Sequence, residues 1–172
     1  MQGEERRQAI LSILRNSGGP VSAGSLAARF AVSRQIVVGD VALLRAGGAE
    51  ISATPRGYIV SRAAPGLVRQ IPCRHDGAGM EAELNAIVDQ GCSVLDVIVD
   101  HPVYGQLTGP LQLSSRYDVG QFLAQCAASD ARPLSDLTGG IHLHTLACPD
   151  EDALRRAREA LRALGVLLES GE

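Results

Sequence analysis

Residues 33–46 read Ser-Arg-Gln-Ile-Val-Val-Gly-Asp-Val-Ala-Leu-Leu-Arg-Ala, and two glycines follow them. Apolar residues recur here at the 3.6-residue period of a helix, at Ile36, Val37, Val41 and Leu44. Ser33 is a favourable N-cap, and the glycines end the pattern. The stretch therefore predicts a helix over about residues 34–46. The side chains exposed at its start are those of Ser33, Arg34, Gln35 and Val38.

Two further helices are predicted before this one. Residues 3–16 carry a helical apolar pattern that a glycine pair and a proline then stop. Ser22 or Ser25 can cap a second, shorter helix that ends near residue 32. A helix, a short turn and a second capped helix form the arrangement that lays one helix in the major groove of DNA. Arginine and glutamine at the start of that helix can reach base edges.

Residues 51–60 predict the strand hairpin that completes a winged helix. They read Ile-Ser-Ala-Thr-Pro-Arg-Gly-Tyr-Ile-Val, two short strands around a Pro-Arg-Gly turn. Arg56 at the tip would touch phosphate or the minor groove. A three-helix domain without a DNA role is the competing interpretation. The residues expected to contact DNA are Ser33, Arg34, Gln35 and Arg56.

The charges are distributed unevenly along the chain. Residues 1–62 hold eight arginines against four acidic residues, whereas residues 63–172 hold eight against fifteen. A basic first part suits phosphate binding, and an acidic remainder suits a cation or a small ligand. Because one winged helix reads only a few base pairs, we expect a homodimer on double-stranded operator DNA.

Two of these segments together resemble a known DNA-binding family. The predicted helix over residues 33–45 and the Ala-Thr-Pro-Arg-Gly-Tyr motif at residues 53–58 are similar to the recognition helix and wing of biotin-repressor-type winged helices. The similarity covers about a third of the chain. It implies that this part of the protein binds DNA.

A proline-glycine segment at residues 61–66 indicates a domain boundary near residue 64. We therefore expect a winged helix-turn-helix DNA-binding domain at residues 1–63 and a ligand- or metal-sensing domain at residues 64–172. The expected fold class is α+β, with an α/β sandwich as the second domain. Its predicted strands lie near residues 67–73, 94–99, 107–113, 141–146 and 166–168, and its predicted helices near residues 80–90, 117–128 and 149–164.

The four histidines all lie in the second domain. Residues i and i+2 of a strand point to the same face, so His142 and His144 can converge on one cation. His75 and either Glu81 or Glu83 are the nearest candidates to complete a set of three nitrogens and one carboxylate. Such a set suits a divalent transition metal: zinc, nickel or iron. Simple polar alternation along the strand is the alternative explanation of the histidine pair.

The order of the motifs around these histidines resembles the three-histidine domain of niacin-responsive transcriptional repressors. The motifs are His75, Asp-His-Pro-Val-Tyr-Gly at residues 100–105 and Gly-Gly-Ile-His-Leu-His-Thr at residues 139–145. The resemblance spans residues 70–168. It implies a repressor of NAD-biosynthesis or niacin-uptake genes that responds to nicotinic acid or nicotinamide. The metal ligands that it implies are His75, Glu83, His142 and His144.

An effector pocket is expected beside this metal site. His101 and Tyr104 would line it, and Arg74 or a backbone N–H would meet the carboxylate or amide of the effector. His101 precedes a proline and can equally cap a loop. Two other functions compete: a repressor that senses the metal alone, and a metal-dependent hydrolase with Asp96 or Asp100 as general base. No nucleophile-base pair is evident in the sequence, so we do not expect an enzyme.

The cysteines and the apolar runs bear on the compartment. Cys73, Cys92, Cys126 and Cys148 form no CxxC pair and are expected to be reduced thiols. Cys73 differs because it lies two residues before His75 and could sit near a site. The longest apolar runs have strand length, and the N-terminus has no apolar signal core. We therefore expect a cytoplasmic protein without a membrane partner.

Overall fold

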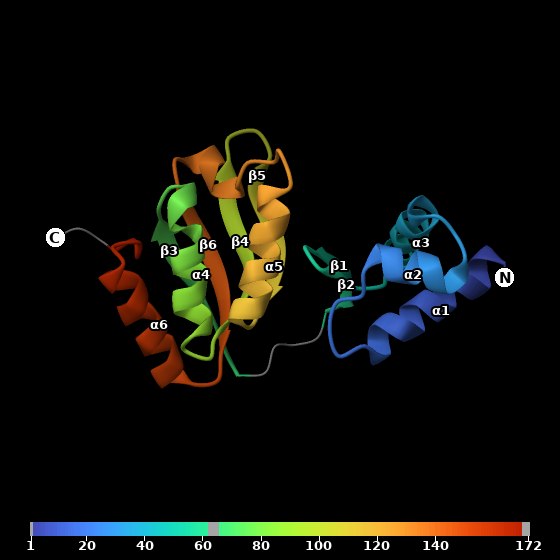
Figure 1. Ribbon diagram of the computed structural model, residues 1–172, viewed down its shortest axis with the longest axis horizontal. Coiled ribbons are helices and arrows are strands. Elements are labelled where there is room, and N and C mark those ends of the chain that lie inside the picture. Colours follow the sequence, from blue (N-terminus) through green and yellow to red (C-terminus); the bar gives the residue numbers. More distant parts are fainter. Residues whose placement is uncertain (1, 62–65, 170–172) are drawn as a thin grey trace. The chain divides into compact units, whose positions relative to one another are not determined.

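The computed structural model describes residues 2–61 and 66–169. The chain divides into two compact units, Met1–Ala63 and Ala64–Glu172 (Figure 1). Each unit has a hydrophobic core of its own. The boundary expected near residue 64 lies within residues 62–65, outside the described part of the chain.

The N-terminal unit consists of three helices followed by a two-stranded antiparallel hairpin. The predicted first and third helices are confirmed with the expected bounds, and so is the hairpin. This element order is that of a winged helix-turn-helix. Its elements are α1 (Gly3–Asn16), α2 (Ala23–Phe30), α3 (Arg34–Ala46), β1 (Ile51–Thr54) and β2 (Gly57–Val60).

Serine caps and one apolar core hold this unit together. Ser22, not Ser25, caps α2, because its Oγ accepts the backbone N–H of Ser25 at 3.0 Å. The core is formed by Ile10, Leu11, Leu14, Leu26, Ala27, Val37, Val41, Leu44 and Ile51. Ile36 was expected in this core but is 43% exposed. The buried residues of α3 begin at Val37. Ile36 lies one position earlier and falls outside the buried face of the helix.

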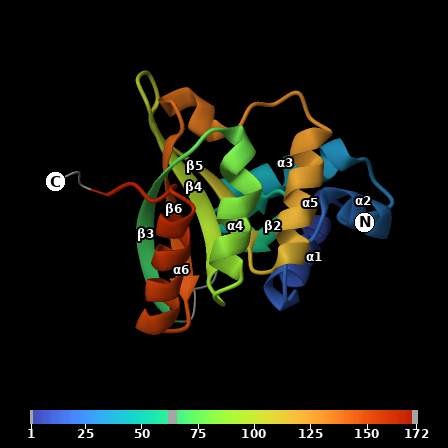
Figure 2. The same ribbon diagram turned by 60° about the vertical axis from the view of Figure 1, so that its left-hand side comes forward.

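The C-terminal unit contains a four-stranded antiparallel sheet with helices on one face (Figure 2). The strand order is β3-β6-β4-β5. This arrangement confirms the expected α+β class. The elements are β3 (Leu67–Arg74), η1 (Gly77–Gly79), α4 (Met80–Val88), β4 (Ser93–His101), β5 (Gly105–Leu113), α5 (Arg116–Ala127), η2 (Leu134–Thr138), β6 (Ile141–Cys148) and α6 (Glu151–Ala163).

The two faces of the sheet differ in burial, and β6 shows this difference most clearly. His142, His144, Leu146 and Cys148 are buried, whereas the residues between them are half-buried. The buried set faces the helices, since successive side chains of a strand alternate between faces. The predicted last strand, residues 166–168, is a single bridge from Leu167 to Cys73 on the edge of β3.

The expectation of four reduced thiols is wrong for one pair. Cys92 and Cys148 form a disulfide, while Cys73 and Cys126 are free. The pairing of Ser93 with Ala147 in the β4–β6 register brings the two cysteines together, with their Cα atoms 4.2 Å apart. They are 56 positions apart in the sequence, so no local motif indicated the pair.

Among the described residues, none of the helices combines the length and apolarity that crossing a lipid bilayer requires.

Candidate functional site

Helix α3 exposes two of the predicted DNA-contacting residues. Arg34 and Gln35 lie exposed in its first turn, and the opposite side of the helix is buried against the core. Ser33 has a structural role, because its Oγ accepts the backbone N–H of Ile36 at 3.3 Å and caps the helix. Arg56 is half-buried in the turn between β1 and β2.

An ion pair that was not expected from the sequence fixes α3 against α1. Asp40 is 4% exposed on the buried side of α3, and its Oδ2 accepts the Nε–H of Arg6 at 2.6 Å. Arg7 approaches the same carboxylate at 3.7 Å. The signal in the sequence was an acidic residue one turn from Val37 and Leu44, within an apolar stripe. The pair orients the helix that presents Arg34 and Gln35.

Four side chains of the C-terminal unit converge at one buried point. Glu83, on α4, is 1% exposed and lies between the rings of three histidines. Its Oε1 is 2.9 Å from Nε2 of His142, and its Oε2 is 2.7 Å from Nε2 of His75 and 3.2 Å from Nε2 of His144. Glu81, the alternative considered from the sequence, is exposed.

The other ring nitrogen of each histidine is held by the backbone. Nδ1 of His142 lies 2.8 Å from the carbonyl oxygen of Gly140, and Nδ1 of His144 lies 2.8 Å from that of Asp96. His75 contacts the carbonyl of Asp76 in the same way. A carbonyl can only accept, so each Nδ1 carries a proton. In the neutral rings, the lone pair of Nε2 therefore faces the centre of the cluster.

The contacts within the cluster shift its protonation equilibria. Burial alone raises the pKa of Glu83, but the hydrogen bonds from His142, His144 and His75 outweigh it and hold this pKa far below its usual range. The hydrogen bond to Glu83 raises the pKa of His75. Burial lowers the pKa of His144, but the contact with Glu83 overcomes this and raises it. Without a cation, Glu83 is therefore ionised, and His75 and His144 hold protons more tightly than an ordinary histidine does.

Two glycines make room for His75 beside this cluster. A Cβ on Gly79 would lie 2.8 Å from Cγ of the His75 ring, and a Cβ on Gly140 would lie 2.3 Å from the His75 carbonyl oxygen. Gly140 also has a φ of +91°. Its carbonyl receives the backbone N–H of His75 at 3.3 Å in addition to Nδ1 of His142. Glycine at positions 79 and 140 is thus a packing requirement of this site.

The donor set fits a divalent transition metal. Three imidazole nitrogens and one carboxylate are ligands that zinc, nickel and iron accept. Backbone partners on the remote nitrogens are the usual means of orienting metal-binding histidines. His75, Glu83, His142 and His144 would hold such an ion, and their burial would exclude bulk water from it.

Among the described residues, no hydrogen bond or ring contact joins the predicted effector residues His101, Tyr104 and Arg74 to this cluster. His101 accepts the backbone N–H groups of Val103 and Tyr104 at 3.1 Å each, so it caps the β4–β5 hairpin. Tyr104 is 76% exposed, with its ring 5.1 Å from that of His101. Arg74 is exposed and alternates with Cys73, so its side chain starts from the opposite face of the sheet.

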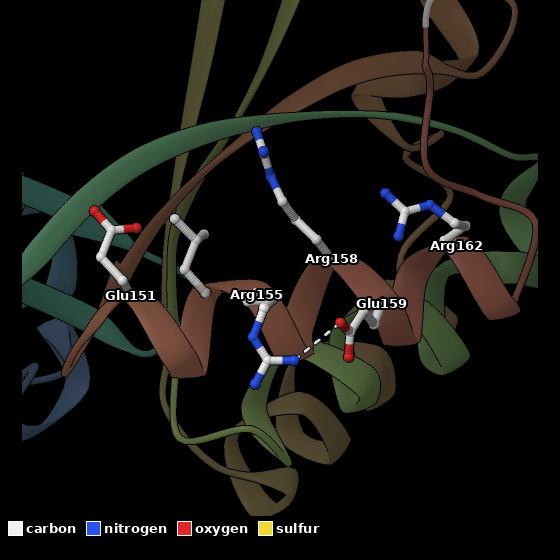
Figure 3. A pocket seen from close by; sticks show the side chains of 6 residues that line it. Glu151, Arg155, Arg158, Glu159 and Arg162 are labelled. Carbon is white, nitrogen blue, oxygen red and sulfur yellow. Dashed lines mark hydrogen bonds and ion pairs between the residues drawn. The ribbon is translucent and has the colours of Figure 1, made fainter.

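A shallow groove of about 260 Å³ lies along the outer side of α6 (Figure 3). Its arginines and glutamates are partly paired, as Arg155 is with Glu159 at 2.9 Å. The groove contains no residue of the histidine cluster, and we assign no ligand to it. It is lined by Glu151, Leu154, Arg155, Arg158, Glu159 and Arg162.

A winged helix-turn-helix and a separate α+β unit in one chain form the architecture of a DNA-binding transcription regulator. Family models agree with both parts: residues 6–59 match an HTH domain, and residues 68–170 match the 3H domain. The second match covers more than half of the chain.

Two relatives are similar to this chain over nearly their whole length. The "Probable transcription repressor NiaR" of Thermotoga maritima is 40% identical over 168 residues, which cover 98% of this chain and 96% of the relative. The "Transcription repressor NadR" of Bacillus subtilis is 41% identical over 172 residues, with the same coverage. The chain belongs to this NiaR/NadR family of transcription repressors, whose members are named as repressors and not as enzymes.

The close approach at Gly140 predicts a specific loss of stability. Gly140→Ala would place a Cβ against the His75 carbonyl at a positive φ, so it should lower the free energy of unfolding by at least about 2 kcal/mol. Gly139→Ala is the matched control, because its φ is +61° and its Cβ would meet nothing within 4 Å. It should cost only about 1 kcal/mol. Urea unfolding of both variants tests this, and equal losses would contradict it.

The shifted pKa values predict how the metal-free protein responds to pH. Because the pKa of Glu83 is lowered, its ionised carboxylate stabilises the fold at pH values above 4.5, the ordinary pKa of a glutamate. This contribution to stability is lost as the pH falls. Because the pKa values of His75 and His144 are raised, their protonated rings stabilise the fold at pH values below 6.5, the ordinary pKa of a histidine. This contribution to stability is lost as the pH rises.

Chelator-treated protein should therefore have its highest free energy of unfolding between pH 4.5 and 6.5. Urea unfolding across a pH series measures this. Glu83→Gln should remove the decline toward alkaline pH. A parent protein that gains stability from about pH 6 to 8 would show that the histidines do not hold extra protons.

Proposed function

We propose that this protein represses genes of NAD biosynthesis or niacin uptake, with nicotinic acid or nicotinamide as its effector and a divalent metal in the buried cluster. The observation that carries the proposal is the convergence of His75, His142 and His144 on Glu83. Membership of the NiaR/NadR family supports it, and so does the resemblance of the histidine motifs to niacin-responsive repressors. A role in transcription control would also require a cytoplasmic location, which is part of this proposal.

The chemistry of the site suits a pyridine effector. When bound, the metal supplies an electrophilic centre to which a pyridine nitrogen can coordinate. Glu83 and the three histidines hold the ion, and the backbone carbonyls of Gly140 and Asp96 keep two of the rings in the ligating orientation. The carboxylate or amide of the effector would then require a hydrogen-bond donor. A backbone N–H is our proposal for that donor, because the side chain of Arg74 starts from the opposite face of the sheet.

The DNA-binding role rests on the face that α3 exposes. Arg34 and Gln35 can hydrogen-bond to base edges, and Val38, 43% exposed one turn further along, can contact a thymine methyl group. Arg56 in the wing would bind phosphate. We propose that two copies of the chain bind paired half-sites. Sedimentation of the protein–operator complex should then show two chains per duplex.

Ligand control of repression requires a difference in binding between two states. The effector promotes repression only if it binds the DNA-competent arrangement more tightly. A coupling energy of about 1–3 kcal/mol, equivalent to about 5- to 150-fold in affinity, is typical of such systems.

The burial of the cluster favours a second candidate function, a repressor that senses the metal alone. The side chains of Glu83, His142 and His144 are 1%, 2% and 4% exposed, and that of His75 is 7% exposed. A bare cation needs less space than a pyridine ring. In this candidate, metal alone changes DNA affinity and nicotinate adds nothing.

Base reading by α3 predicts a sequence-specific loss of affinity. The probe is a duplex that the parent protein selects from a randomised library. Arg34→Ala and Gln35→Ala should each weaken binding to it by about 1–3 kcal/mol and leave binding to an unrelated duplex nearly unchanged. Arg56→Ala should weaken both complexes and flatten their salt dependence.

Arg132→Ala is the control for these variants, because it removes an exposed arginine from the other unit. It should bind both duplexes like the parent. If Arg34→Ala and Gln35→Ala bind the selected duplex as tightly as the parent, α3 does not read bases.

The effector site predicts that metal retention and the nicotinate response are lost together. Metal-loaded protein should bind the selected duplex about 5- to 150-fold more tightly with nicotinate or nicotinamide. Benzoate, which has a carboxylate but no ring nitrogen, should have no effect. His142→Ala and His144→Ala should lose both the metal and the response while keeping the basal DNA affinity.

Two results would decide against the pyridine effector. A parent protein that responds to metal alone and ignores nicotinate would support the metal-sensing candidate. A double His142→Ala, His144→Ala variant that still responds to nicotinate would show that the effector binds elsewhere.

A further inference from the structure

Cys73 is a fifth ligand-type side chain at the histidine–glutamate cluster. It is fully buried, and it lies directly opposite His142 in the β3–β6 register, so both side chains face the helices. Its Sγ, a carboxylate oxygen of Glu83 and a ring nitrogen of His142 all lie within 4.8 Å of one another. Three different donor elements, sulfur, oxygen and nitrogen, thus meet at one buried point.

We propose that Cys73 binds the metal as a thiolate, alongside Glu83 and the histidines. The inference rests on the proposed metal site and extends it by one ligand. On binding, the S–H bond breaks, a sulfur–metal bond forms, and the thiol proton passes to solvent, without any oxidation or reduction. Each bound ion therefore releases one more proton than the histidines and Glu83 account for.

The balance of charge at this buried point supports the assignment. A divalent cation held by three neutral imidazoles and one carboxylate leaves an uncompensated positive charge, and a buried charge is costly unless it is paired. Within residues 66–169, the other buried carboxyl group is that of Asp118, which accepts the backbone N–H of Ser114 at 2.9 Å. The thiolate of Cys73 would bring the net charge of the filled site to zero.

A sulfur ligand also changes which metals the site prefers. Thiolates favour zinc and other soft or borderline ions over magnesium and manganese, which prefer oxygen donors. Cys126 offers a matched control, since it is the other free cysteine of the described residues and lies on α5.

The test is an absorption titration of the full-length, chelator-stripped protein with Co²⁺ under a non-thiol reductant. A thiolate ligand gives an intense sulfur-to-cobalt charge-transfer band in the near ultraviolet, which nitrogen and oxygen ligands do not give. We expect this band in the parent and in Cys126→Ser, and its loss in Cys73→Ser. Cys73→Ser should also weaken Zn²⁺ binding by about 100-fold.

The outcomes separate this inference from the proposed metal site. Visible cobalt bands without the ultraviolet band in the parent would overturn the role of Cys73 and leave the site in place. Persistence of the ultraviolet band in Cys73→Ser would overturn it as well. A parent that binds no Co²⁺ would overturn both.

Should Cys73→Ser fail to fold, X-ray absorption of the zinc-loaded parent decides. One sulfur scatterer at about 2.3 Å supports the assignment, and a shell of nitrogen and oxygen alone rejects it.

Discussion

The buried carboxylate of Glu83 is the constraint on which the organisation of the C-terminal unit depends. A charge that is 1% exposed must be compensated, and the three histidines supply that compensation from one strand, β6, and from the turn that follows β3. To reach Glu83, β3 and β6 must pair in one register, and α4 must pack with the correct face inward. The same arrangement that satisfies the charge without a metal leaves three ring nitrogens pointing at one place.

The N-terminal unit also contains a buried carboxylate that must be compensated, and there an arginine compensates it. Asp40 could have been an ordinary apolar position of α3, but its contact with Arg6 fixes the rotation of the helix about its axis. That rotation keeps Arg34 and Gln35 on the exposed side. In both units, a buried acid specifies the placement of the residues that would carry the function.

The sequence was informative where a pattern is periodic and local. The apolar repeat of residues 34–46 gave the bounds of α3, and the spacing of His142 and His144 gave their shared face. The sequence was not informative where the outcome depends on how helices and strands pack against one another. Glu81 and Glu83 differ by the rotation of one helix, Cys92 and Cys148 meet through a strand register, and the hairpin cap formed by His101 depends on the path of its own turn.

One carbonyl oxygen links two histidines that lie far apart in the sequence, His75 in the turn after β3 and His142 on β6. The Gly140 oxygen receives both the backbone N–H of His75 and the ring of His142. A movement of this single peptide group would therefore disturb the backbone of His75 and the ring of His142 together. The turn before β6 is thus a place from which two of the four proposed metal ligands can be displaced at once.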